Sequence, residues 1–236
     1  MSRDDTFELS YSAADAKRVL VLLLACEILL VFSYCVVHIF APGVKWGPIK
    51  LFVDVDREAA IPTWLSTVQL FAIGILFLLH AVAAKQLRLY FIIFGLGFLF
   101  LSMDEAAVIH EKIIDSAKRV EWQWLLFLTL KGSHKAWMIP YVATGVLALG
   151  VSYRFLLFLW RNARRESILF VIGIAIFCIG GIGLELLAFY FEEAPTDTPY
   201  AWVIAGEEFL EMAGMTIVLY ATLLLGIRIQ SKSLSK

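Results

Sequence analysis

Acidic residues interrupt stretches of the chain that are otherwise apolar enough to lie in lipid. Three of them, Glu207, Glu208 and Glu211, stand within five residues and are followed by a long apolar run. A charged side chain costs about 2.5–3.5 kcal/mol near the centre of a bilayer, even on the insertion scale with the smallest penalties. Like charges at this spacing also repel each other along a helix. Carboxylates crowded in such a place have to take up protons or bind a cation, so the sequence predicts a buried acidic site.

A second polar group closes the apolar run that ends in LSMDEAAVIHEKI. Asp104 and Glu111 are seven residues apart and would share one face of a helix. Glu105 and His110 would lie on the flanking faces. Carboxylate and imidazole groups within one or two turns suit metal binding or acid–base catalysis. The alternative is a helix end that emerges into water, which suits Glu111 better than Asp104, because IIFGLGFLFLSM directly precedes the aspartate.

Two more apolar runs would each add polar groups to this site. Glu185 follows the stretch GIAIFCIGGIGL, whose glycines at 173, 180, 181 and 183 allow helices to approach closely in a membrane. Glu27 and His38 are eleven residues apart and return to nearly the same face of a helix. We expect this face to point inward. The structural alternatives are a headgroup position for His38 and a pairing of Glu27 with another helix.

The elements that position these residues follow from composition. Of the 236 residues, 61% are hydrophobic and 17% are charged, and the mean hydropathy is +0.81. Ordinary soluble domains are about 45–50% apolar and 25% charged. The sequence therefore predicts an all-α polytopic membrane protein in which residues 1–236 form a single integral membrane domain with a bundle of six transmembrane helices. The expected spans are 19–41, 63–84, 88–111, 136–159, 167–191 and 201–227, and the apolar stretch 122–130 is expected as a short interfacial helix or re-entrant piece.

Basic residues predict the orientation in the membrane. With both termini inside, twelve Lys and Arg residues fall in inner segments and eight in outer ones. The tight turn RNARR at 161–165 would be inside, and the loop EEAPTDTP at 192–199, which has no basic residue, outside. We therefore expect an N-in, C-in protein of a bacterial inner membrane. In this orientation, the polar residues of five or six helices share one depth near the outer leaflet.

Several function classes find no support in the sequence. A net charge of −1 gives no electrostatic case for nucleic-acid binding. The three cysteines lack CxxC spacing and form no disulfide framework, and no Walker loop, HExxH or GxSxG triad is present. Ser102, Asp104 and His110 resemble the serine, aspartate and histidine of the ceramidase and progestin-receptor-like membrane hydrolases. Those families have a histidine pair late in the chain, where this sequence has Glu207 and Glu211.

These patterns favour a metal-dependent membrane enzyme that acts on a lipid or another apolar substrate. Its expected metal ligands are carboxylates and histidines: Asp104, His110, Glu111, Glu185, Glu207, Glu211, His38 and Glu27. The expected catalytic residues are Asp104, Glu105 and Glu208. Because carboxylates outnumber histidines, the ligands suit iron, manganese or another hard divalent ion. Zinc with an activated water would make the protein a hydrolase.

Two other functions are consistent with the same residues. Intramembrane carboxylates also mark the pathways of proton-coupled or cation-coupled transporters. An accessory subunit of a membrane complex would use its acidic residues to pair with a partner membrane protein, and its carboxylates would then face outward from the bundle.

Overall fold

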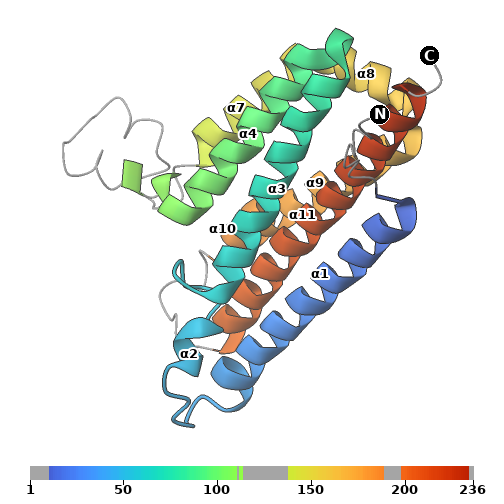
Figure 1. Ribbon diagram of the computed structural model, residues 1–236. Coiled ribbons are helices and arrows are strands. Elements are labelled where there is room, and N and C mark those ends of the chain that lie inside the picture. Colours follow the sequence, from blue (N-terminus) through green and yellow to red (C-terminus); the bar gives the residue numbers. More distant parts are fainter. Residues whose placement is uncertain (1–10, 111, 114–137, 189–197, 234–236) are drawn as a thin grey trace, which may run out of the picture.

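The protein is a bundle of long helices (Figure 1). The computed structural model describes residues 11–110, 112–113, 138–188 and 198–233, and every regular element in these ranges is helical. Five continuous helices are long and apolar enough to cross a membrane, and a sixth span is present if one bent pair of helices is counted. The predicted all-α fold is therefore confirmed.

The helices follow one another up and down the bundle. In chain order they are α1 (Ala13–Tyr34) with its π-helical continuation η1 (Cys35–Phe40), α2 (Ile49–Phe52), α3 (Ile61–Ala83), η2 (Lys85–Leu87), α4 (Arg88–Ala107), α7 (Met138–Val151), α8 (Tyr153–Asn162), α9 (Arg164–Cys178), the π-helical η4 (Ile179–Leu184), α10 (Glu185–Ala188) and α11 (Thr198–Ser233). The expected interfacial stretch 122–130 lies outside the described residues.

Helix α11 is the centre of the bundle. It has 36 residues, which corresponds to a length of about 54 Å, and it packs against α1, α3 and α9. Most of its apolar span is buried, unlike the other spans. Helix α1 begins and α11 ends at the same end of the bundle, toward the upper right of Figure 1, which we call the terminal end. The opposite end, with α2 and the start of α11, is called the α2 end.

The fourth expected span, 136–159, is not one straight helix. Helix α7 ends at Val151, α8 begins at Tyr153, and the two axes differ by 64°. Gly150 and Ser152 stand at the break, and a glycine and serine pair is a common cause of a sharp kink. Helix α8 is amphipathic, with Trp and Arg residues in the sequence YRFLLFLWRN. Such a helix is typical of the boundary between lipid and water.

Glycines bring α9 and η4 to within backbone distance of α11. A Cβ atom on Gly173 would lie 2.7 Å from the carbonyl oxygen of Gly214, and one on Gly180 would lie 2.8 Å from the carbonyl oxygen of Glu207. Real side chains do not approach backbone atoms so closely, so only glycine fits at these two positions. Gly183 differs, because its nearest neighbour would be 4.0 Å away. The predicted close approach is therefore correct for Gly173 and Gly180 and wrong for Gly183.

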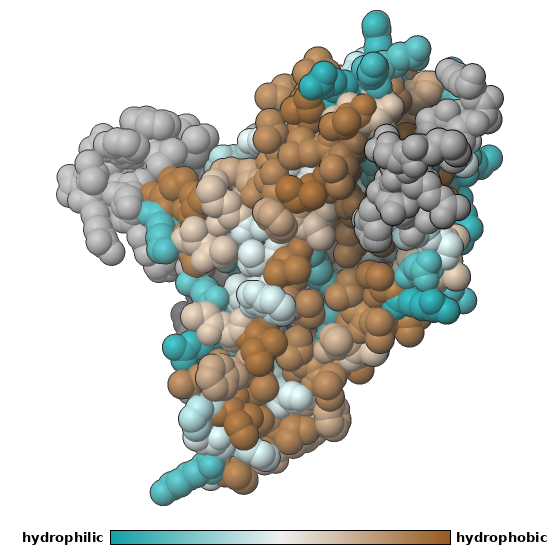
Figure 2. All heavy atoms as spheres, in the orientation of Figure 1, coloured by the Kyte–Doolittle hydropathy of each residue, from teal (hydrophilic) through white to brown (hydrophobic). Residues whose placement is uncertain are grey.

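Apolar side chains cover the outside of the bundle. Figure 2 shows brown, hydrophobic residues spread over the visible face between both ends. Leu22, Leu89 and Leu147, on three different helices, are 64%, 67% and 67% exposed. A soluble monomer rarely exposes apolar area of this extent, and a multi-pass membrane protein presents such a surface to lipid.

We predict that Gly180→Ala destabilises the protein and that Gly183→Ala does not. The new methyl group at position 180 meets backbone atoms of α11, which cannot move without shifting the helix, and overpacking of this kind costs about 1–3 kcal/mol. Thermal unfolding of the purified protein in detergent measures the difference. Equal melting temperatures for the two variants would show that the close helix approach does not limit stability.

Candidate functional site

Helix α4 ends in a turn with an unusual backbone. Val108 has φ 52° and ψ 46°, the left-handed conformation, which a β-branched residue rarely adopts. Its side chain is buried, and its N–H donates to the carbonyl oxygen of Asp104 at 2.6 Å. A new helical turn starts directly afterwards, at Ile109. Strained backbone of this kind costs about 1–3 kcal/mol and gathers at functional sites, so this turn is a candidate site.

The turn folds His110 back onto Asp104. The Oδ1 atom of Asp104 accepts the backbone N–H of His110 at 2.8 Å, and its Oδ2 atom lies 3.0 Å from the Nδ1 atom of the same residue. Tyr141 of α7 adds a third group: its ring stands edge-on to the His110 ring at 6.2 Å, and its hydroxyl interacts with Asp104. A histidine held by a carboxylate at Nδ1 presents Nε2 as its basic atom.

Five glutamates from three helices lie within electrostatic range of one another. Glu105 of α4, Glu185 of α10 and Glu207, Glu208 and Glu211 of α11 form this group, which we call the acidic cluster. Glu185 and Glu207 share a hydrogen bond. Glu105 links the cluster to the turn, because it interacts both with His110 and with Glu211. The acidic groups of α4 and α11 are thus within electrostatic range of each other.

The π-helical segment η4 forms one wall of the acidic cluster. A Cβ atom on Gly181 would lie 2.6 Å from Oε1 of Glu211, so this carboxylate rests on the backbone of η4. Glu207 is 5% exposed, and none of the described residues offers a hydrogen bond to its Oε2 atom. π-helical turns are rare and frequently lie at functional sites.

Glu27 lies apart from the acidic cluster and has neutral partners. Its Oε1 atom accepts hydrogen bonds from Nε2 of Gln69 at 2.6 Å and from Oγ1 of Thr216 at 2.5 Å. All three side chains are fully buried. Glu27 therefore connects α1, α3 and α11 within the bundle, which is the pairing with other helices named above as the structural alternative to metal ligation.

His38 lies near the α2 end, on η1. Its ring stacks on Tyr34 with centroids 4.5 Å apart. Its Nε2 atom is 3.4 Å from the carbonyl oxygen of Lys50 and 3.9 Å from Oδ2 of Asp54. His38 thus faces α2 and Asp54, which lies just beyond it.

The expected single metal site with eight ligands is not seen. Within the described ranges, no group of three or more His, Cys, Asp or Glu side chains is placed to hold a metal ion. Asp104 pairs with His110, the glutamates gather in the acidic cluster, and Glu27 and His38 have partners of their own. Glu111 lies outside the described residues. Helical periodicity placed Asp104 and Glu111 on one face, and it does not hold across the left-handed turn at Val108.

Some residues near the site were not identified from the sequence. Asp56 accepts a hydrogen bond from the Tyr200 hydroxyl at 3.5 Å and interacts with Glu208, and Glu58 interacts with Glu105. The run VDVDRE at 53–58 was an available signal for both. Three hydroxyl residues gave no such signal, because hydroxyl groups are ordinary in spanning helices: Tyr141, Thr216 and Ser66, which forms a hydrogen bond with Glu105.

Comparison with known proteins gives a family for the chain. The model of a domain of unknown function, DUF8692, matches residues 19–227. The chain belongs to this family. The DUF8692 match includes every described residue of the turn, the acidic cluster and the Glu27 network. No curated protein and no solved structure matches the chain.

We predict that Glu27→Ala destabilises the protein more than Glu27→Gln does. The alanine variant leaves the buried donors of Gln69 and Thr216 without an acceptor, which costs about 1–3 kcal/mol. Glutamine keeps one oxygen at this position. Thermal unfolding in detergent compares the two, with Cys26→Ala on the exposed face of α1 as the control. Equal losses in the alanine and glutamine variants would mean that the charge of Glu27, and not its acceptor atom, matters.

Proposed function

We propose that this protein is a membrane-embedded enzyme that acts on a lipid or another apolar substrate, with His110 and a bound divalent cation at its site. The observation that carries the proposal is the strained turn at Val108. It holds the imidazole of His110 against Asp104 and beside the acidic cluster.

The pair of Asp104 and His110 supports acid–base chemistry or metal ligation. In both uses, a carboxylate at Nδ1 fixes the ring orientation and the tautomer, and Nε2 accepts a proton or binds a metal. The two hydrogen bonds from His110 to one carboxylate fix both its backbone and its ring. Tyr141 contacts both members of the pair, with its ring edge-on to His110 and its hydroxyl interacting with Asp104. A histidine held in this way is better oriented for chemistry than a surface histidine.

The acidic cluster supports a hard divalent cation. Neighbouring buried carboxylates repel one another, and a bound cation would remove the repulsion. Oxygen ligands suit iron, manganese or, with a histidine, zinc. Glu105, Glu208 and Glu211 would hold the ion. The described side chains form no group of three that could hold a metal ion, so binding would require these glutamates to move closer together, with water and substrate as further ligands.

A transporter has less support. On α3, His80 follows Gln69 by eleven residues, or about 16 Å along the helix. Buried Ile73 and Phe77 lie between them in the apolar core. A proton or cation would have to cross this apolar layer to leave the Glu27 network toward the terminal end.

An accessory subunit also has less support. An accessory subunit would present its carboxylates on the outside of the bundle, where a partner protein could contact them. Glu27 and Glu207 are both buried in the bundle.

We predict that the purified wild-type protein binds Mn²⁺ with near-stoichiometric occupancy and that Glu211→Gln loses it. Glutamine keeps the shape and removes the charge. Glu27→Gln is the matched control, because it removes a buried carboxylate outside the acidic cluster, and it should keep the ion. Equilibrium dialysis with metal analysis measures the occupancy. If the wild-type protein contains no metal and its stability does not change in chelator, the proposed cation binding is wrong. Acid–base chemistry at His110 would then be the only part of the proposal left.

We also predict that both termini face the cytoplasm, which puts the acidic cluster toward the outside. An epitope tag after Lys236 should be reached by a membrane-impermeant reagent only after permeabilisation. Labelling of intact cells would reverse the orientation and move the site to the inner leaflet.

A further inference from the structure

A wide-open, largely apolar depression of about 500 Å³, which we call the cavity, lies at the terminal end of the bundle, away from the acidic cluster. The start of α9 and one residue of α11 line it: Arg164, Arg165, Ile168, Leu169 and Tyr220. Two cationic groups and an apolar wall therefore share one cavity, and the proposed enzyme site uses none of these residues.

The two arginines of this cavity have no acidic partner among the described residues. The guanidinium of Arg164 lies over the ring of Trp160 at 5.8 Å. Nη2 of Arg165 lies 3.5 Å from the hydroxyl oxygen of Tyr220. Both contacts orient the guanidinium groups without neutralising them, so no carboxylate of the described residues offsets these two positive charges.

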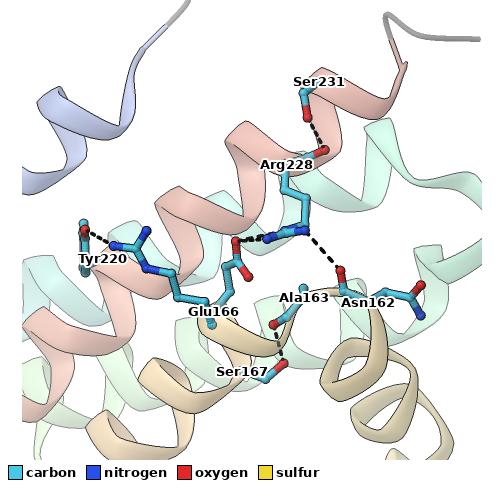
Figure 3. A network of polar contacts seen from close by, with 8 residues as sticks. Asn162, Ala163, Glu166, Ser167, Tyr220, Arg228 and Ser231 are labelled. Carbon is cyan, nitrogen blue, oxygen red and sulfur yellow. Dashed lines mark hydrogen bonds and ion pairs between the residues drawn. The ribbon is translucent and has the colours of Figure 1, made fainter.

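A neighbouring arginine shows the opposite arrangement. Arg228 of α11 is ion-paired with Glu166 at 2.9 Å, and it also donates to the carbonyl oxygen of Asn162 at 3.2 Å (Figure 3). Its charge is offset, and its side chain joins α11 to the corner between α8 and α9. Within the described part of the chain, one arginine at this end is thus paired with a carboxylate and the two at the cavity are not.

The apolar wall decides what kind of anion fits. Ile168 and Leu169 stand one turn along α9 from the arginines, and Ile168 is 37% exposed. A soluble anion would gain nothing from this wall. An amphipathic ligand would place its anionic group on the guanidinium groups and its hydrocarbon on the isoleucine and leucine.

We propose that this cavity binds an anionic phospholipid, with its phosphate between Arg164 and Arg165 and its upper acyl chain along Ile168 and Leu169. Arginine suits the phosphate because its planar donors contact two oxygens at once. Basic pockets beside membrane helices recognise anionic headgroups in this way. The amphipathic helix α8 leads directly into the cavity and carries Trp160, whose ring supports Arg164.

Binding of phosphatidylglycerol to the purified protein in mixed detergent micelles tests the proposal. Removal of both charges in the double variant Arg164→Gln/Arg165→Gln should weaken binding about 30-fold, or about fivefold for each charge. The control is Arg88→Gln/Arg154→Gln, which removes the same charge from α4 and α8 and should change binding less than twofold. The double variant Arg164→Lys/Arg165→Lys keeps both positive charges, which also help to set the orientation in the membrane. It should still weaken binding several-fold, because lysine cannot make the bidentate contact of arginine with two phosphate oxygens.

Three results would overturn the proposal. The first is an equal loss in the Arg88/Arg154 control, which would indicate attraction to the whole basic end. The second is equally tight binding of phosphatidylcholine by the wild type. The third is displacement of the lipid by inorganic phosphate at matched concentration, which would assign the two arginines to a soluble anion.

Discussion

The close approach of α11 to α9 and η4 is the contact on which the rest of the bundle depends. Lipid gives no hydrophobic drive for helices to associate, so small residues that let backbones meet supply much of the attraction. Gly173 and Gly180 provide that meeting here. The same contact places Glu211 on the backbone of η4 and Glu207 against Glu185. Helix association and the crowding of carboxylates therefore have one origin, and neither can change without the other.

The sequence predicted the helices well because bilayer thickness sets their length and lipid sets their composition. Five of the six expected ranges coincide with single long helices. The break between α7 and α8 could not be predicted, since Gly150 and Ser152 are common in spanning helices that stay straight. The turn at Val108 was harder still, because valine is among the residues least suited to a left-handed conformation. The structure pairs Asp104 with His110, and the expected partner Glu111 lies outside the described residues.

Glu27 shows a different limit of sequence reasoning. A glutamate in the middle of an apolar run could be recognised from the sequence as a residue with a role. The sequence did not reveal whether its partners are charged or neutral. Those partners, Gln69 and Thr216, lie 42 and 189 residues away in the chain. Only the packing of α1, α3 and α11 brings the three together. An intramembrane carboxylate can thus serve the fold as well as the chemistry, and its neighbours distinguish the two.

The π-helical segments η1 and η4 affect how the protein tolerates changes in length. A π turn holds about one residue more than an α turn over the same rise. Loss of one residue from Ile179–Leu184 would allow an ordinary α-helix with almost unchanged apolar length. Everything beyond it would then keep its facing, because the π turn and the α turn that replaces it complete the same rotation, and Glu185 would still face Glu207. Loss of one residue from the α-helical part, Arg164–Cys178, would instead rotate everything beyond it by about 100° around the helix axis and turn Glu185 away. The membrane would accept such a shortened span, so the geometry of the acidic cluster, rather than insertion, limits deletions in this helix.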